Sequence, residues 1–452
     1  MNLKIQEDSK NFYKKMIIIG IPVVFQNLIS LSLNLIDTLM IGVLGEQQLA
    51  AVGAANQVFF IFNICLFGMF SGAAVYTAQY FGAKDLKGVR RMLGIDYSVG
   101  ITFSIFVSAI ALSLAPQIIA IFSKEQAVIE YGCDYLYIAA YSYIFTAVSM
   151  AISYNARAIQ NLKVPTIING LALILNAILN YFLIFGIGPC PELGVRGAAF
   201  ATLTARIFEC AALLIYIYTR KEHPFKTGIE NLKFSYEMFV KVMKMAVPVV
   251  ITEGGWAISV ALIFAAYGKI GTAALAVVQV ANVVTEMMQS FYFGVGNATA
   301  MLIGEMLGKG DREAAYRDAV KSLKIVAVMN IFMTVILMLL SRPIAGIYHF
   351  NSETTTLLVQ TICTMALIIT PRMFGYMFIV GILRAGGDTV YCMKVETLCN
   401  LLIHVPIAFF AVMVLHTSLP FAIILGEIGN LIRIAICWPR FKSRKWINIV
   451  TD

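Results

Sequence analysis

The second half of this 452-residue chain repeats the first half at a spacing of 226 residues. The repeat begins at Pro22-Val23-Val24, which returns as Pro248-Val249-Val250. The later matches are mostly residues that shape the backbone or permit close helix contacts: Gly42 and Gly268, Gly45 and Gly271, Ala55 and Ala281, Asn56 and Asn282, Gly82 and Gly308, Asp85 and Asp311. A chain with this pattern is expected to fold into two similar halves.

The composition places both halves in a membrane. Hydrophobic residues make up 60% of the chain and charged residues 13%, and the mean hydropathy is +0.81. Apolar runs of about 20 residues, long enough to cross a bilayer, recur along the whole length. We therefore predict an all-α integral membrane protein with twelve transmembrane helices, at residues 15–42, 50–80, 92–115, 128–153, 165–187, 196–218, 240–268, 274–305, 319–341, 354–381, 391–414 and 419–439.

Lysine and arginine are distributed unevenly between alternate connections. With both termini in the cytoplasm, 27 of the 34 Lys and Arg residues lie inside and four lie outside. Positive residues accumulate in cytoplasmic loops, so we expect a multi-pass protein of the cell (inner) membrane with both termini cytoplasmic. The net charge of +9 follows from this bias. It favours contact with anionic membrane lipid and gives no reason to expect nucleic acid.

Each copy of the repeat has six spans, an even number, so both copies enter the membrane from the same side. Parallel repeats of this kind are related by an axis along the membrane normal and place their working site between the copies. We expect an N-terminal six-helix lobe (residues 1–219), a cytoplasmic linker (220–239) and a C-terminal six-helix lobe (240–452). The two lobes should show pseudo-two-fold symmetry around a central cleft.

Several kinds of chemistry are not indicated by the sequence. The chain has no GxxxxGK[ST] loop to hold nucleotide phosphates. Its eight cysteines include no CxxC pair, and its four histidines are scattered. Metal sites need closely spaced ligands of these types. We therefore expect free thiols, no metal site, no cofactor and no enzymatic activity.

Asp37 is the most informative charged residue, because it lies inside the first span. Charged groups at such depth cost at least about 3 kcal/mol and usually have a function. A polar stripe leads to Asp37 on one helix face, at spacings of three and four residues: Asn27, Ser30, Asn34 and Asp37. The stripe predicts an ion or proton site, although an acid near the interface that reaches water would show the same pattern.

Two more spans of the first half carry polar residues on one face. They are Asn169, Asn176 and Asn180 in the fifth span, and Thr202, Arg206 and Glu209 in the sixth. An asparagine oxygen can bind a cation or pair with a carboxyl group. Asparagine also joins membrane helices, and both interpretations stay open. We interpret Arg206 and Glu209 as a structural ion pair.

The acids of the second half do not repeat those of the first, since Asp37 aligns with Ile263. The eighth span carries a polar stripe of its own, and the seventh contains Glu253. We assign one set of residues to a substrate cleft, with a water-exposed helix face as the alternative: Asn34, Glu253, Asn282 and Glu286. Glu305 is interpreted as a cap or hinge residue, and the lone acids Glu396 and Glu427 receive no role.

Several short motifs occur in a fixed order along the chain. The first is Asp37-Thr38-Leu39-Met40-Ile41-Gly42-Val43-Leu44-Gly45; the others are Leu183-Ile184-Phe185-Gly186, Gly197-Ala198-Ala199-Phe200-Ala201-Thr202, and the paired Arg157-Ala158 and Arg384-Ala385-Gly386-Gly387. Together they resemble the multidrug and toxic compound extrusion (MATE) family, and the resemblance covers essentially the whole chain.

The resemblance implies a secondary antiporter that exports drugs or organic cations in exchange for H⁺ or Na⁺ by alternating access. The family's coupling residues match Asp37, Asn176, Asn180 and Thr202. Some members have an aspartate at the position of Asn180, so this chain has one carboxylate fewer. Another branch has an acid in the tenth helix at the position of Met373. Coupling is therefore expected to depend on Asp37, with Na⁺ at Asp37 the one possible metal ion.

Two other classes remain as alternatives. A flippase for lipid-linked precursors belongs to the same superfamily, but such proteins have a strongly cationic cavity, whereas only Arg206, Arg372 and Arg433 lie within spans here. A multi-pass protein that does not transport is the second alternative. The expected partners are a small lipophilic or cationic substrate and membrane lipid, and the expected state is a monomer.

Overall fold

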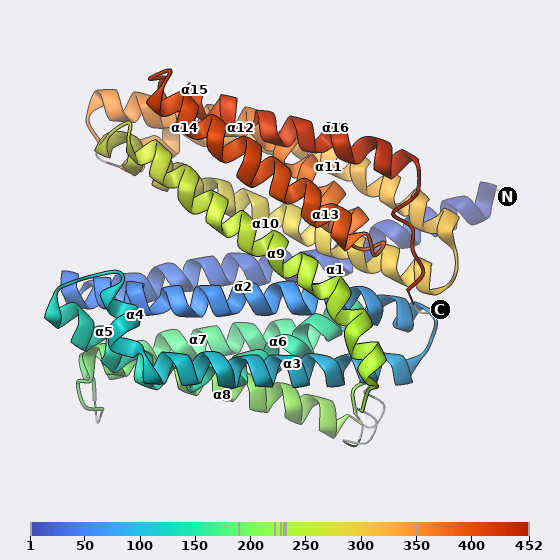
Figure 1. Cartoon of the computed structure of the whole chain (residues 1–452), viewed down its shortest axis with the longest axis horizontal. Coiled ribbons are helices and arrows are strands. Elements are labelled where there is room, and N and C mark those ends of the chain that lie inside the picture. The colour runs from blue at the N-terminus through green and yellow to red at the C-terminus, as the bar shows by residue number, and fades with distance from the viewer. Residues whose placement is uncertain are drawn as a thin grey trace. The chain divides into compact units, whose positions relative to one another are not determined.

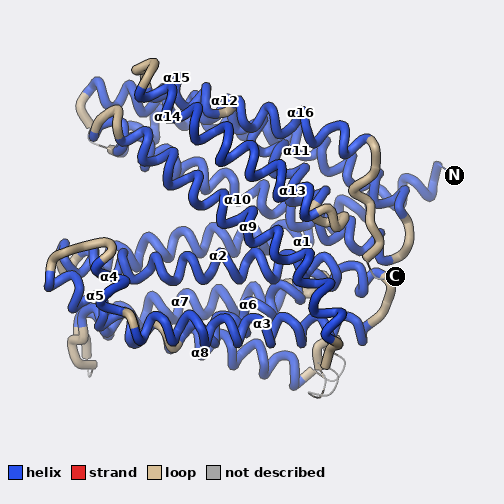
Figure 2. Tube along the Cα trace, in the orientation of Figure 1, coloured by secondary structure: helices blue, strands red, loops and turns tan. Residues whose placement is uncertain are grey.

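A computed structural model describes residues 2–188, 190–220, 223–226, 228, 233–348 and 350–450, with side chains placed except at 2–10 and 272. Residues 221–222, 227 and 229–232 of the expected linker, 220–239, lie outside the described residues. Everything described is helix, turn or loop, as Figure 2 shows. The predicted all-α membrane architecture is confirmed.

The helices of the first half follow the expected spans closely. They are α1 (Asn2–Gly42), α2 (Glu46–Gly82), α3 (Leu86–Ser113), α4 (Ala115–Ala120), α5 (Gln126–Ala139), α6 (Ser142–Ala158), α7 (Lys163–Phe185) and α8 (Gly194–Thr219). The predicted fourth span consists of α5 and α6, which meet at a bend of 50°.

The second half begins with three long helices and continues in shorter pieces. They are α9 (Tyr236–Gly268), α10 (Thr272–Gly308), α11 (Arg312–Ile347), α12 (Ser352–Tyr376), the π-helix η2 (Met377–Leu383), α13 (Thr389–Glu396), the π-helix η3 (Thr397–His404), α14 (Val405–Met413), α15 (Leu419–Gly426) and α16 (Ile428–Lys442). Several of these pieces join end to end, so that α12 with η2 makes one span, as do α13 to α14 and α15 to α16.

Ten helices of the described chain are long and apolar enough to cross a membrane, or eleven if the bent α5–α6 pair is one span. The remaining predicted span is α10, which has 37 residues. Its polar stripe at Gln279, Asn282, Glu286 and Gln289 lowers its apolar character. The count of twelve is reached when α10 is included as a span, because α10 is the counterpart of α2 in the repeat.

The chain forms two compact units, which we call the N unit (Phe25–Met243) and the C unit (Met1–Val24 with Lys244–Asp452). Their boundaries differ from the expected lobes at the first helix, because α1 up to Val24 groups with the second half of the chain. The remainder of α1, which carries Asp37, belongs to the N unit. Figure 1 shows α1 and the other helices in chain order by colour.

In the N unit, α2, α3, α5, α6, α7 and α8 pack on one another. An aromatic cluster fills part of this core, with the rings of Phe62 and Tyr143 stacked at a centroid distance of 4.8 Å. A buried polar group links three helices: Asn155 of α6 donates to Asp96 of α3 at 2.6 Å and accepts from Thr77 of α2 at 2.8 Å. Asp96 therefore keeps a hydrogen-bond partner despite its burial.

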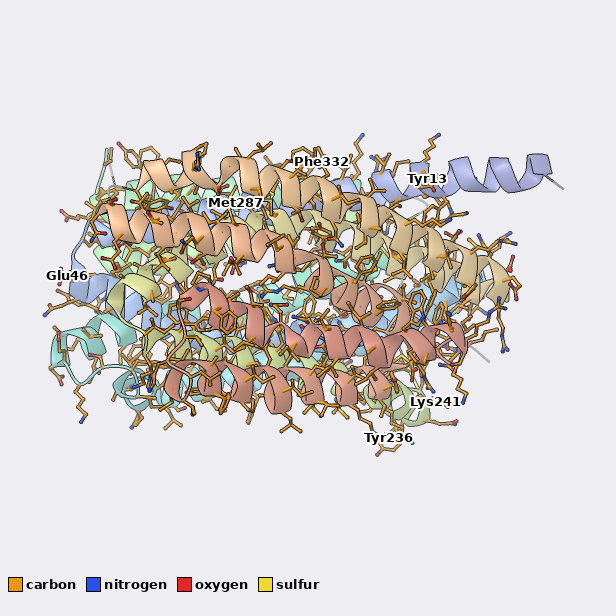
Figure 3. All side chains as sticks on the ribbon, turned by 90° about the horizontal axis from the view of Figure 1, so that it is seen from above. Tyr13, Glu46, Tyr236, Lys241, Met287 and Phe332 are labelled. Carbon is orange, nitrogen blue, oxygen red and sulfur yellow. The ribbon has the colours of Figure 1, made fainter. Side chains whose placement is uncertain are left out.

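In the C unit, α10, α11, α12, η2 and α16 surround a core that includes Tyr292, Phe378 and Trp446. Apolar side chains also cover the outer surface, as expected for a helix bundle in lipid. Phe332 on α11 and Met287 on α10, both exposed, are labelled among them in Figure 3.

Candidate functional site

The candidate site of the N unit is built from three helices. Asp37 lies on the part of α1 that belongs to this unit, Asn176 and Asn180 lie on α7, and Thr202 lies on α8. Because Asn176 and Asn180 are four residues apart, both amides face the same side of α7. α7 and α8 pack against each other along their length. The fold thus brings together the four residues predicted to couple the ion.

The Asp37 carboxylate is held by two amides, one for each oxygen. Asn180 Nδ2 donates to Asp37 Oδ1 at 2.8 Å. With its amide oriented to satisfy both neighbours, Asn176 Nδ2 donates to Asp37 Oδ2 at 2.9 Å, and its oxygen accepts from the Thr202 backbone N–H at 3.2 Å. Both asparagines are buried, whereas Asp37 is half-buried.

The orientation of the Asn176 amide depends on the charge of Asp37. An ionised carboxylate can only accept hydrogen bonds, so it requires the amide nitrogen. A protonated carboxyl group can donate, so it tolerates the amide oxygen, and then Asn176 Nδ2 lies 3.4 Å from Thr202 Oγ1. In that second orientation Asn176 Nδ2 also faces the Thr202 backbone N–H, so only the first orientation, which suits the ionised carboxylate, satisfies both neighbours.

The site also has an unused oxygen. Asn180 Oδ1 is buried and has no hydrogen-bond partner among the described residues. It belongs to the amide that donates to Asp37, so it lies close to the carboxylate. Carboxylate, amide and hydroxyl oxygens are the ligands that hard cations prefer. Asp37, Asn180 and Thr202 supply one of each type.

Tyr135 of α5 belongs to the same group and was not predicted from the sequence. Its hydroxyl donates to Asn56 at 3.3 Å and also interacts with Thr202. Tyr135 is almost fully buried. Twenty tyrosines occur in the chain, and nothing in their spacing distinguishes this one, because its neighbours come from three other helices.

Arg206 and Glu209 form the ion pair that the sequence indicated, at 2.7 Å. Glu209 also accepts a hydrogen bond from Asn169 of α7 at 2.9 Å. Asn169 thus joins α7 to α8 and is separate from the two asparagines that hold Asp37.

The residues assigned to a substrate cleft have different surroundings. Glu253 of α9 accepts a hydrogen bond from Arg384 at 2.8 Å, and Arg384 is buried. Asn282 and Glu286 lie one turn apart on α10, and Glu286 is exposed with no side-chain partner among the described residues. Asn34 is exposed on α1, one turn before Asp37. Their assignment to a cleft stays a prediction.

Glu396 and Glu427 are not lone acids, as the sequence had suggested. Glu396 pairs with Arg433 at 3.2 Å, and Asn400 bridges the two side chains with hydrogen bonds of 2.5 Å to each. Glu427 pairs with Arg372 and accepts from Asn430 at 2.6 Å. Each of these two arginines is therefore paired with a glutamate, and the distance between the partners along the chain hides the pairing in the sequence.

Among the described residues, no group of three or more His, Cys, Asp or Glu side chains could hold a metal ion. The described cysteines are all free. The arrangement around Asp37 can accept a proton on the carboxylate, or bind a monovalent cation through oxygens. It contains no nucleophile with an adjacent base of the kind that covalent catalysis uses.

Comparison with known proteins gives matches along almost the entire chain. The MatE family model matches residues 22–182 and 248–410. A probable multidrug resistance protein NorM from Thermotoga maritima is 25% identical over 449 residues, covering 98% of this chain and 94% of the relative. A probable multidrug resistance protein NorM from Rhizobium meliloti is 27% identical over 337 residues, covering 74% and 72%.

Solved structures share the fold at lower sequence identity. The outward-facing structure of a multidrug resistance MATE family transporter of the MOP superfamily has a TM-score of 0.86 and 18% identity, with 96% of each chain covered. A MOP superfamily transporter from Pyrococcus furiosus, described as having a binding pocket of reverse polarity, has a TM-score of 0.85 and 17% identity, with 95% of each chain covered.

Proposed function

The chain belongs to the MatE family, and on this premise we propose that it is a membrane transporter for multidrug efflux that works as an antiporter. It exports lipophilic or cationic small molecules in exchange for H⁺ or Na⁺. The relatives named as multidrug resistance proteins support the class of substrate. The observation that carries the coupling step is the Asp37 carboxylate held between the Asn176 and Asn180 amides.

Asp37 couples the two movements by changing its charge. When the site faces outward, Asp37 takes up a proton or a Na⁺ ion and the substrate leaves. When the site faces inward, the ion leaves and substrate binds again. The ion and the substrate need not touch, because it is enough that they favour different states of the protein. The internal repeat supports such alternating access, since two similar halves can move against each other.

The candidate ions make different demands on the site. A proton requires only the Asp37 carboxylate. Sodium requires several oxygens, and the unpartnered Asn180 Oδ1 beside Asp37 would be one of them. The experiment should therefore impose a pH gradient and a Na⁺ gradient separately.

Efflux of a fluorescent organic cation from reconstituted vesicles tests the proposal, with a pH gradient or a Na⁺ gradient imposed separately. We expect only one gradient to drive transport, and we expect Asp37→Asn to abolish it while the protein stays folded. Asp134→Asn is the matched control, because Asp134 is a surface acid of the same unit that pairs with Arg196 at 2.8 Å. Unchanged efflux in Asp37→Asn would overturn the proposal.

The charge balance of the arginines within the spans argues against export of a pyrophosphate-linked lipid. Arg206, Arg372 and Arg433 each pair with a glutamate. A cavity for pyrophosphate requires positive charges that are not already neutralised. These paired arginines therefore give no support to the flippase alternative.

A further inference from the structure

The C unit contains a cavity of about 300 Å³ at one end of its helices. Its walls come from three elements: the early part of α1, the last turns of α10 and the first turns of α11. The charge distribution of the sequence places this end on the cytoplasmic side, since the connection from Lys309 to Arg317 is rich in positive residues. The cavity is separate from Asp37, which belongs to the N unit.

Four positively charged side chains line the cavity: Lys15 on α1, Lys309 directly after α10, and Arg317 and Lys321 on α11. Two acids, Asp311 and Asp318, line the cavity with them, and a third acid, Glu305, contacts two of the lysines. Glu305 binds Lys15 at 2.8 Å and Lys309 at 2.5 Å, and Asp318 binds Lys321 at 3.1 Å. Asp311 accepts from the backbone N–H of Ala314 at 2.8 Å and caps α11.

Each of these acids already accepts a hydrogen bond or an ion pair from a neighbour, and the cations outnumber them. Lys15 donates to both oxygens of Glu305, and Lys309 makes one bond of this kind. An ammonium group has three hydrogens, so both lysines retain donors for a further ligand. The four cations and two acids that line the cavity give its wall two net positive charges, or one if the adjacent Glu305 is counted as well.

Arg317 is the side chain with the most unused capacity. It lines the cavity, is exposed, and makes no hydrogen bond or ion pair with another described residue. Arginine presents five donors in a planar fork that suits the oxygens of a phosphate group. Arg317 lies four residues before Lys321 on α11, so the two cations face the same side of the helix.

The remaining wall is apolar. Phe12 and Leu302 are buried and line the cavity together with Met306. The Lys321 ammonium lies 4.9 Å from the centre of the Phe12 ring, which fixes its position over an apolar surface. The cavity thus combines a cationic rim with hydrocarbon contacts at the level where a membrane surface is expected.

We propose that this cavity binds a phosphate group, carried by an anionic phospholipid of the inner leaflet and held by Arg317 with Lys309. Basic pockets between membrane helices on the cytoplasmic side recognise lipid head groups in this way. A free phosphate ion has the same oxygens and would meet the same donors. Phe12, Leu302 and Met306 favour the lipid, because they contact hydrocarbon and a free ion has none.

The test uses the full-length protein in neutral detergent, titrated with phosphatidylglycerol or phosphatidylethanolamine and analysed by native mass spectrometry. Phosphatidylethanolamine has the same phosphate but adds an ammonium group, which the four cations repel. We expect preferential binding of phosphatidylglycerol, and about tenfold weaker binding in Arg317→Gln, because charge-assisted hydrogen bonds to phosphate are strong. Size-exclusion chromatography checks that the variant stays folded.

The internal repeat supplies the matched control. Arg91 is the counterpart of Arg317 at the spacing of 226 residues, is also exposed, and lies on α3 of the N unit. We expect Arg91→Gln to bind phosphatidylglycerol as the unmodified protein does. Equal losses in both variants, or no loss in Arg317→Gln, would overturn the proposal.

Competition with inorganic phosphate distinguishes the two sources of the anion. If phosphate alone displaces phosphatidylglycerol from the unmodified protein but not from Arg317→Gln, the site recognises the anion without its lipid. If phosphate does not displace the lipid, the hydrocarbon contacts are required, as we expect. The binding measurement does not depend on transport, so its result is independent of the proposed antiport.

Discussion

Single residues of the Asp37 site act through partners on other helices. The carboxylate comes from α1, its amide donors from α7, and the nearby hydroxyl of Thr202 from α8. Each carboxylate oxygen of Asp37 accepts a hydrogen bond from a different amide, so neither amide should be able to take over the hydrogen bond of the other. At this scale the proposed coupling depends on amides whose individual importance the sequence left open.

Replacing Asn180 should weaken coupling without unfolding the protein. Asn180→Leu removes the donor to Asp37 Oδ1 and the unused oxygen beside it. We expect ion-driven efflux to fall about tenfold or more, because a hydrogen bond to a charged group contributes about 1.5–3 kcal/mol. The measurement is initial efflux rate in vesicles under the gradient that drives the unmodified protein.

Asn169→Leu is the matched control for Asn180→Leu. Asn169 lies on the same helix, but its amide bonds Glu209 instead of Asp37. Its loss should lower stability while efflux per folded protein stays within about twofold, since its bond only joins α7 to α8. If both variants lose the same fraction of transport, Asn180 has no special role at Asp37.

His223 should make the N unit less stable in mild acid. Burial lowers the pKa of His223 below its ordinary value of 6.5, and the nearby Arg220 lowers this pKa further. Its Nδ1 accepts the backbone N–H of Phe225 at 3.2 Å, and its ring packs against Tyr216. Protonation of Nδ1 would remove that acceptor.

The sign of the pH effect follows from this lowered pKa. The folded state binds the proton less readily than the unfolded state, so the contribution of neutral His223 is complete above about pH 6.5 and is lost at lower pH. We expect the melting temperature of the unmodified protein to fall, relative to His223→Phe, between about pH 7 and about pH 5. A constant difference between the two melting curves would contradict this expectation.

Helices of the C unit approach one another most closely where glycines meet. Gly20 of α1 and Gly294 of α10 bring their backbones together: a Cβ on Gly294 would lie 2.7 Å from the Gly20 oxygen and 2.6 Å from Val24 Cγ2. The segment of α1 before Phe25 is thus packed into the C unit by contacts that leave no room for a side chain. Lys15 adds an ion pair to Glu305 on the same helix, α10.

Gly294→Ala should therefore destabilise the protein, although alanine favours helices. We expect a loss of about 1–3 kcal/mol, because the new methyl group meets backbone that cannot move aside freely. Gly53→Ala is the matched control in α2, where a Cβ would meet no atom within 4 Å. That control should be neutral or stabilising by up to about 1 kcal/mol. Thermal unfolding in detergent measures both, and a stable Gly294→Ala variant would show that the helices can separate.

For the whole molecule, the orientation in the membrane follows from charge alone and can be tested directly. Single cysteines are introduced into a variant without the eight native cysteines. Lys124→Cys should react with a membrane-impermeant reagent added to intact cells, and Lys87→Cys should react only after the membrane is opened. Both positions are exposed, on connections predicted to be outside and inside respectively. Labelling of Lys87→Cys in intact cells would reverse the predicted topology.

The sequence by itself determined the class, the duplication and the number of spans, because these depend on features that are local in the chain. A bilayer requires about 20 apolar residues per helix, and a repeat at fixed spacing is visible without any contact. The pair Arg206 and Glu209 was predictable for the same reason, since residues three apart on a helix are neighbours. Asp37 was singled out by its depth in the first span and its polar stripe, and the resemblance to a family then assigned the coupling role to it together with Asn176, Asn180 and Thr202.

Only the tertiary structure decided which distant residues meet. It joined Asp37 to amides about 140 positions away, matched Glu396 and Glu427 with arginines, and placed Tyr135 beside Thr202. It also assigned the first 24 residues to the C unit and formed the cavity at Arg317. Buried polar groups need hydrogen-bond partners, but this requirement does not determine which helix supplies the partner. That choice is made by the packing of helix faces, which no local pattern in the chain records.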